Sequence, residues 1–97
     1  MPTYVVLIDW TQEGVRGFRE SVDRYEAASA QLEGIGVRFT DVYWTLGNHD
    51  LVVVAEAADD ETLAAGLLAV ASVGNIRTTT LRAFSRDEMR SVISRAP

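Results

Sequence analysis

The sequence predicts a single α+β domain, residues 1–97, with a ferredoxin-like fold in which four antiparallel strands lie in the order 4-1-3-2. Hydrophobic patterns follow one another as strand, helix, strand, strand, helix, strand, and a short helix is added at the C-terminus. The first and third strands, which this fold places at the centre of the sheet, are apolar throughout. The fourth is rich in threonine and more polar, which suits an edge position. Both longer helices are expected on one face of the sheet.

The first strand is predicted from Tyr4 to Trp10, because its first five residues are apolar or aromatic without interruption. Thr11 can cap the helix that follows, since its hydroxyl can accept a hydrogen bond from a free amide of the first turn. Apolar residues then recur three and four positions apart, which predicts one continuous amphipathic helix ending at Gly34 and Gly36. The residues expected to face the sheet are Val15, Phe18, Val22, Tyr25, Ser29 and Leu32.

The second and third strands are predicted from Val37 to Leu46 and from Leu51 to Ala55. Gly47-Asn48 between them is a signal for a two-residue hairpin turn. Adjacent residues of a strand point to opposite faces of the sheet, so Tyr43 and Trp44 must lie on different sides. Since both are large and aromatic, we expect both faces of the sheet to be covered.

The second helix is predicted to begin at Asp59 or Asp60 and to end at Gly74-Asn75. Its residues expected to face the sheet are Leu63, Leu67 and Val70. The helix crosses back to a fourth strand, predicted from Ile76 to Phe84.

A short terminal helix is predicted after the fourth strand. Ser85 followed three residues later by Glu88 matches a capping box, in which the two residues satisfy each other's backbone amides. Met89, Val92 and Ile93 are expected to pack inward.

Composition excludes several classes of function. The chain has 9 Lys and Arg against 14 Asp and Glu, a net charge of −5 and no basic run, so electrostatic binding to nucleic acid or to an anionic membrane is not expected. Cysteine is absent, which excludes disulfides, thiolate metal sites and cysteine nucleophiles. A single histidine, His49, excludes a two-histidine metal site within one chain. We therefore expect no metal and no cofactor.

The size of the chain favours self-association. A domain of 97 residues buries only about 60–65% of the surface that its unfolded chain exposes. Since both helices are expected on one sheet face, a second copy is the simplest cover for the other face, and the sequence predicts a homodimer, with higher assembly left open. The N-terminus carries no positively charged region, and its apolar run is too short to cross a membrane, so a cytoplasmic location is expected.

Three segments in register resemble the GYD domain family of small bacterial proteins. They are Tyr4 to Thr11, Tyr43 to Val52 and Gly74 to Phe84. The resemblance spans nearly the whole chain and implies a ferredoxin-like fold of the dimeric α+β barrel type, in a family that has no settled activity. Where the family has Gly-x-Tyr-Asp, this chain has Gly47-Asn48-His49-Asp50.

The predicted topology brings several functional side chains to one end of the sheet. The candidate ligand-binding residues are Trp10, Tyr43, Trp44, His49, Asp50 and Arg77. The three aromatic residues could form a wall for a flat ligand, and the start of the first helix favours an anion at the same end. Each residue also has a structural alternative: core or interface packing for the aromatic residues, solvent exposure for His49, backbone hydrogen bonds for Asp50, and an ion pair with Asp9 or Asp50 for Arg77.

Two main functions compete at this stage. The first is a small homo-oligomeric binding or regulatory module with a small anionic or aromatic ligand, held between sheet and helices or at the dimer seam. The second is an enzyme, by analogy with the cofactor-free oxygenases, haem enzymes and isomerases that share the fold. In that case His49 with Asp50 would transfer a proton and Arg77 would hold an anionic substrate. A third, purely structural role would place a different protein on the open sheet face. The binding module needs no strong nucleophile, and the sequence favours it.

Overall fold

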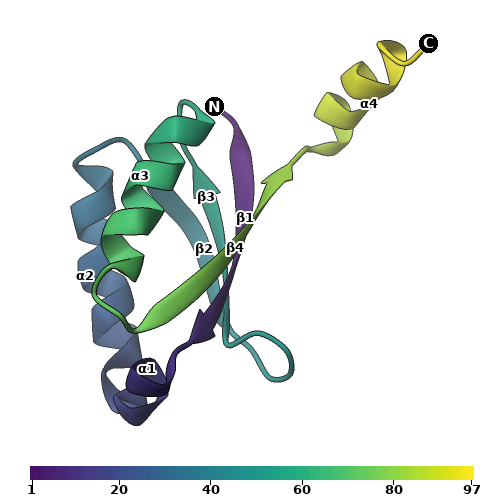
Figure 1. Ribbon diagram of the computed structural model, residues 1–97. Coiled ribbons are helices and arrows are strands. Elements are labelled where there is room, and N and C mark those ends of the chain that lie inside the picture. The colour runs from purple at the N-terminus through teal and green to yellow at the C-terminus, as the bar shows by residue number, and fades with distance from the viewer.

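The computed structural model describes residues 1–97 and confirms the α+β ferredoxin-like fold (Figure 1). The sheet has four strands in the order β2-β3-β1-β4, and all neighbouring strands are antiparallel. The elements are β1 (Thr3–Trp10), α1 (Gln12–Arg16), a 3-10 turn η1 (Phe18–Glu20), α2 (Ser21–Glu33), β2 (Arg38–Trp44), β3 (Leu51–Glu56), α3 (Asp60–Ala71), β4 (Ile76–Ala83) and α4 (Arg86–Ser94). None of the helices combines the length and apolar character that crossing a bilayer requires.

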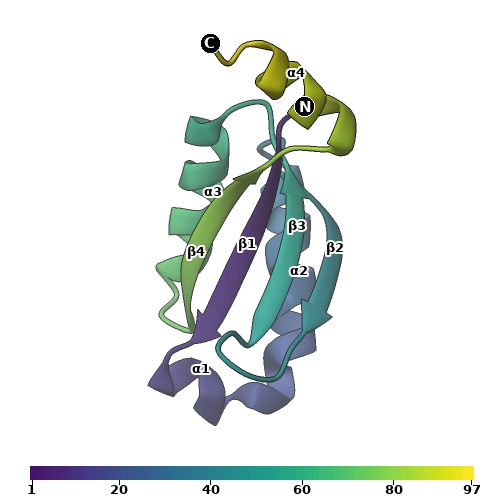
Figure 2. The ribbon, with the colours of Figure 1, turned by 90° about the vertical axis from the view of Figure 1, so that its right-hand side faces the viewer.

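Two layers make up the body of the molecule: α2 and α3 cover one face of the sheet, and the other face is bare (Figures 1 and 2). Along the central strands β1 and β3 every second residue is buried under the helices. Val6 and Val53 are directly paired and have no exposed surface. The intervening residues, such as Leu7 and Val52, face the bare side and are half-buried.

The second helix and the edge strand agree with the sequence pattern. The Asp59 carboxylate accepts a hydrogen bond of 2.8 Å from the Thr62 amide, which caps α3, and hydrogen bonding by Thr62 lowers the pKa of Asp59. Leu63 and Leu67 are buried and Val70 is half-buried, as predicted. The threonine-rich β4 lies at an edge of the sheet.

The first helical segment is broken, and the prediction of one continuous helix was wrong. The chain turns at Gly17, and the carbonyl groups of Gly14 and Gly17 accept hydrogen bonds of 3.1 and 2.6 Å from the Arg24 guanidinium. The Gly17 carbonyl also accepts from the Glu20 amide at 3.1 Å, and the Arg24 side chain of α2 joins both sides of the break. The break rotates α1, and Val15 and Phe18 are about half exposed instead of facing the sheet. Val22 is also exposed, Tyr25 and Ser29 are half-buried, and only Leu32 of the predicted row is fully buried.

The connection between β2 and β3 is a six-residue loop, residues 45–50, and not the predicted two-residue turn. The Thr45 amide donates to the Asp50 carbonyl at 2.9 Å, and the Thr45 hydroxyl donates to the His49 carbonyl at 2.6 Å. These bonds close the loop before the strands can pair further, so β2 ends at Trp44, and Leu46 is fully exposed. Gly47, with φ of +102°, supplies the left-handed residue that the loop needs.

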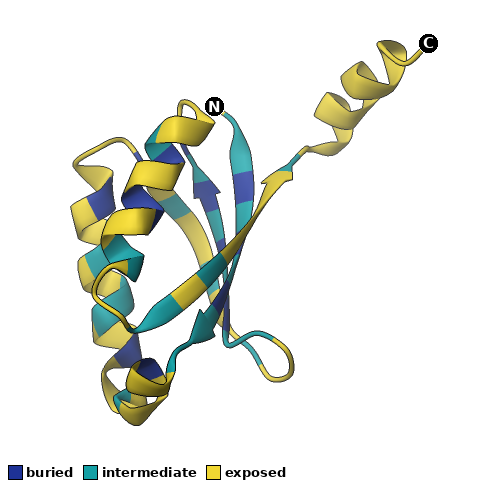
Figure 3. Ribbon diagram, viewed as in Figure 1, coloured by how far each residue is buried: buried dark blue, intermediate teal, exposed yellow.

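The terminal helix α4 begins at the predicted capping box but does not pack inward. The Ser85 hydroxyl accepts from the Glu88 amide at 3.1 Å, and the Ser85 amide donates to the Glu88 carboxylate at 2.8 Å, which lowers the pKa of Glu88. Strand β4 carries α4 away from the body, and every residue of α4 is exposed (Figures 1 and 3). No apolar side chain of α4 is therefore buried within the chain.

Candidate functional site

The predicted cluster at the end of the sheet is divided between the two faces. By the strand register, Trp10 and Trp44 lie on the helix side, whereas Tyr43 and Arg77 lie on the open side. Tyr43 and Trp44 thus point to opposite faces, as predicted from their adjacency. The six candidate residues do not line one common cavity.

On the open side, His49 forms a pair with Asp9. His49 Nδ1 lies 3.0 Å from Asp9 Oδ1, and the two side chains are 37% and 26% exposed. The sequence predicts Asp50 as the carboxylate that could orient His49. Asp9 was missed as its partner, because only the longer loop turns the imidazole back over the end of β1.

Asp50 anchors the loop to the central strand. Its carboxylate Oδ2 accepts a hydrogen bond of 2.9 Å from the Trp10 amide, and its own amide donates to the Ile8 carbonyl at 2.8 Å. The alternative of backbone bonding is therefore the one that the structure bears out for Asp50. Arg77 lies opposite Asp9 in the register but forms no ion pair with Asp9 or Asp50.

On the helix side, Trp44 is fixed by a small aromatic cluster. Its Nε1 donates a hydrogen bond of 2.9 Å to the buried Ser21 hydroxyl. Tyr25 contacts the Trp44 ring edge to face at 5.8 Å and stacks on Phe39 at 5.9 Å. Burial raises the pKa of the Tyr25 hydroxyl. This cluster ties β2 to the first half of α2.

A cleft of about 240 Å³ opens between α2, α3 and the sheet. Its floor is formed by Ile8, Leu51 and Val53 of the central strands. Of the six candidate residues only Trp10 lines it, together with the aromatic rings of Tyr25 and Phe39. Two alanines in the middle of α2, Ala27 and Ala28, leave the space, and this pair of small residues is the sequence signal for the cleft.

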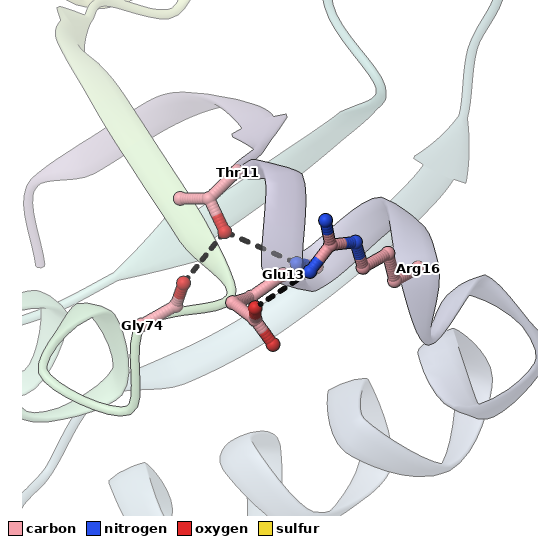
Figure 4. A network of polar contacts seen from close by, with 5 residues as sticks. Thr11, Glu13, Arg16 and Gly74 are labelled. Carbon is pink, nitrogen blue, oxygen red and sulfur yellow. Dashed lines mark hydrogen bonds and ion pairs between the residues drawn. The ribbon is translucent and has the colours of Figure 1, made fainter.

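Thr11 joins the start of α1 to the segment that leads into β4 (Figure 4). Its hydroxyl donates to the Gly74 carbonyl at 2.6 Å and accepts from the Gly14 amide at 3.1 Å, while its amide donates to the Asn75 carbonyl at 3.0 Å. The predicted cap at Thr11 is confirmed. Because Thr11 already satisfies the Gly14 amide and α1 has only five residues, this helix start gives an anion little to bind. The Glu13–Arg16 ion pair in the same view is exposed and contributes little.

Comparison with known proteins agrees with this architecture. A model of the family described as "GYD domain" matches residues 4–93. The chain belongs to the GYD domain family. Asp50, the aspartate of the name-giving motif, is the residue that anchors the loop on β1, and the histidine in the tyrosine position is the one that pairs with Asp9.

Two relatives of this GYD domain come from Thermus thermophilus. A protein named "Glutamine synthetase and cystathionine beta-lyase binding protein" is 38% identical over 85 residues, which is 87% of this chain and 90% of that protein. The crystal structure of TTHA0845 from the same species is similar with a TM-score of 0.57 at 26% identity, covering 88% of this chain and 95% of that one. Both likenesses extend over nearly the full length of each protein.

Proposed function

We propose that this GYD domain is a homodimeric regulatory module that binds a metabolic enzyme and performs no reaction of its own. The observation that carries the proposal is the 38% identity, over nearly the whole of both chains, to a Thermus protein named for binding glutamine synthetase and cystathionine β-lyase. A relation that spans nine-tenths of the other chain includes its surfaces as well as its core. A binding role is therefore the function best supported for this chain.

The surface area of the isolated chain supports the dimer. Its accessible surface is 6459 Å², whereas a compact monomer of 10.6 kDa is expected to expose about 5,500 Å². The excess of about 1,000 Å² is close to the roughly 800 Å² that each partner buries in a standard protein interface. The extra accessible surface of one chain is thus about the area that a second copy would bury.

Part of the exposed apolar surface lies on the open sheet face and on α4. Val5, Leu7 and Val54 form the middle of the open face, and Leu81 on the edge strand is 48% exposed. In α4, Met89, Val92 and Ile93 are 44, 40 and 61% exposed. Because the same surface is present on every copy, two chains can pair face to face about a two-fold axis.

An enzyme remains the second candidate, and the His49–Asp9 pair is the observation that favours it. A carboxylate at 3.0 Å can orient an imidazole for proton transfer. The arrangement expected from the sequence is weaker, however, because Asp50 is engaged by the Trp10 amide and Arg77 is not directed by any ion pair.

Calorimetric titration tests the proposed function. The purified chain is titrated separately into glutamine synthetase and into cystathionine β-lyase from its own host, with an unrelated acidic enzyme as the control. We expect saturable binding to at least one of the two, with a Kd of about 1–10 µM, as is typical of regulatory contacts of modest area. Absence of binding to both enzymes at about 100 µM would refute the proposal for these partners.

A further inference from the structure

The cleft between α2 and α3 results from a divergence of the two helices. At one end the helices touch, since a Cβ added to Gly66 would lie 3.1 Å from a methyl group of Leu32. Toward the other end the facing residues are Ala28 on α2 and Leu67 and Val70 on α3, and here the helices enclose the space of about 240 Å³. Gly66 thus lets the two helices touch at one end. At the other end the short side chain of Ala28 leaves the space of the cleft unfilled.

The walls of this space are apolar and aromatic. Twelve of its sixteen lining residues are hydrophobic, and they include the rings of Trp10, Tyr25 and Phe39. Offset stacking and edge-to-face contacts with such rings favour a planar aromatic guest. The volume exceeds the roughly 150 Å³ that accommodates benzene and lies below the 300 Å³ or more of sites for drug-sized ligands. A bicyclic ring system is the size that fits.

One cation lines the cleft and is held in a fixed position. Arg24 is the only charged residue that lines it, and its guanidinium is held in place by the Gly14 and Gly17 carbonyls at 3.1 and 2.6 Å. A guanidinium has five N–H donors, so these two bonds leave others free for a carboxylate. In a chain of net charge −5, a held arginine beside an apolar cavity selects for a ligand with a single negative group.

We propose that this cleft binds a small planar aromatic carboxylate, with its ring system between α2 and α3 and its carboxylate at Arg24. The site lies on the helix side of the sheet, whereas the surface proposed for dimerisation lies on the open side. The inference therefore goes beyond the proposed function and does not depend on it.

The experiment uses 2-naphthoate as the probe and two variants of the same helix. Ala28→Leu fills the cleft, whereas Ala30→Leu makes the same change at an exposed position of α2. We expect the full-length wild-type chain to bind 2-naphthoate with a Kd of about 100 µM, consistent with the efficiency of a ligand of this size. Ala28→Leu should weaken binding at least about tenfold, and Ala30→Leu should leave it unchanged within about twofold.

A neutral probe and a spectrum of the wild-type chain complete the test. 2-Naphthamide should bind about fivefold more weakly than 2-naphthoate, because it lacks the charge that pairs with Arg24. Amide resonances that shift on addition of 2-naphthoate should map to Ala28, Val70 and Trp10, a result that stands even if Ala28→Leu does not fold. Absent binding at about 1 mM, equal binding by Ala28→Leu, equal affinity for the neutral probe, or shifts confined to the open sheet face would each overturn the proposal.

Discussion

Tyr4 joins the central strand to the first turn of α3 through a single polar contact in the core. Its hydroxyl donates a hydrogen bond of 2.5 Å to the Asp60 carboxylate, and the residue is 2% exposed. That hydrogen bond, together with burial and the negative charge of Asp60, raises the pKa of Tyr4 to about 12. A buried phenol that donates to a carboxylate resists ionisation because the phenolate would face a like charge.

This contact predicts a specific loss of stability at high pH. The ordinary pKa of tyrosine is 10.0, so between pH 10 and about 12 the native chain keeps a proton that the unfolded chain has lost. The contribution of Tyr4 is fully present below pH 10 and is lost as the pH rises through about 12. The urea midpoint should fall more steeply over this range in the wild-type chain than in Tyr4→Phe.

Asp60→Asn provides the second variant, because it removes the carboxylate that raises the pKa of Tyr4. Its urea midpoint should also depend less on pH above 10 than that of the wild-type chain. Parallel curves for all three proteins would show that Tyr4 does not couple folding to pH.

At the level of single residues, the sequence predicted which side chains lie at the same end of the sheet better than it predicted which face of the sheet each one occupies. The topology placed Trp10, His49 and Asp50 at one end of the sheet, and they do lie there. Their faces depend on the strand register and on the loop length, which the pattern of apolar residues does not encode. The Gly47-Asn48 signal gave too short a turn, and with it the wrong carboxylate for His49.

At the level of elements, Gly14 allows the close packing of α1 on the segment that leads into β4. The helix packs so closely on the start of β4 that a Cβ at Gly14 would lie 1.9 Å from the Asn75 carbonyl oxygen. The Thr11 hydroxyl bridges the same two segments by bonding the Gly14 amide and the Gly74 carbonyl. Together these contacts hold α1 against the segment that leads into β4.

Gly14→Ala should therefore destabilise the chain by about 3 kcal/mol or more, since the clash is with backbone and cannot be relieved by a rotamer change. Gly34→Ala is the matched control, because its φ of −61° suits alanine and its Cβ would come no closer than 3.3 Å to the Gln31 carbonyl. It should change the free energy of unfolding by less than about 1 kcal/mol. Chemical denaturation with urea measures both, and equal midpoints for the two variants would contradict the close approach.

Local signals predicted where elements begin more reliably than how they continue. The caps at Thr11, Asp59 and Ser85 are all present, because each cap is a bond between residues close in sequence. The break at Gly17 is bridged by Arg24, which reaches back from the next helix to the Gly14 and Gly17 carbonyls. A tertiary contact of this kind leaves no trace in the spacing of apolar residues along the helix.

At the level of the whole molecule, one chain is more extended than a compact domain of its length. Its radius of gyration is 14.5 Å, whereas a compact domain of 97 residues is expected to have about 12.5 Å. The difference comes from α4, which extends beyond the sheet on the side that the other helices leave bare (Figures 1 and 2). The sequence predicted the apolar stripe of α4 correctly but placed it in the core of the same chain. In the structure no residue of β4 is buried, and α4 lies beyond the core.

The oligomeric state tests the central proposal, that a second copy of the chain covers the open face of the sheet. Sedimentation equilibrium is measured for the wild-type chain, for Leu81→Arg on the open face, and for Leu68→Arg on the outer side of α3 as the control. Leu81 and Leu68 are 48 and 72% exposed, so neither change should disrupt the core.

We expect the wild-type chain and Leu68→Arg to sediment at twice the mass of one chain at about 10 µM, and Leu81→Arg to sediment as a monomer, because an unpaired charge in an apolar interface costs several kcal/mol. A wild-type chain that stays monomeric at about 100 µM, or a Leu81→Arg variant that dimerises as well as Leu68→Arg, would contradict the account.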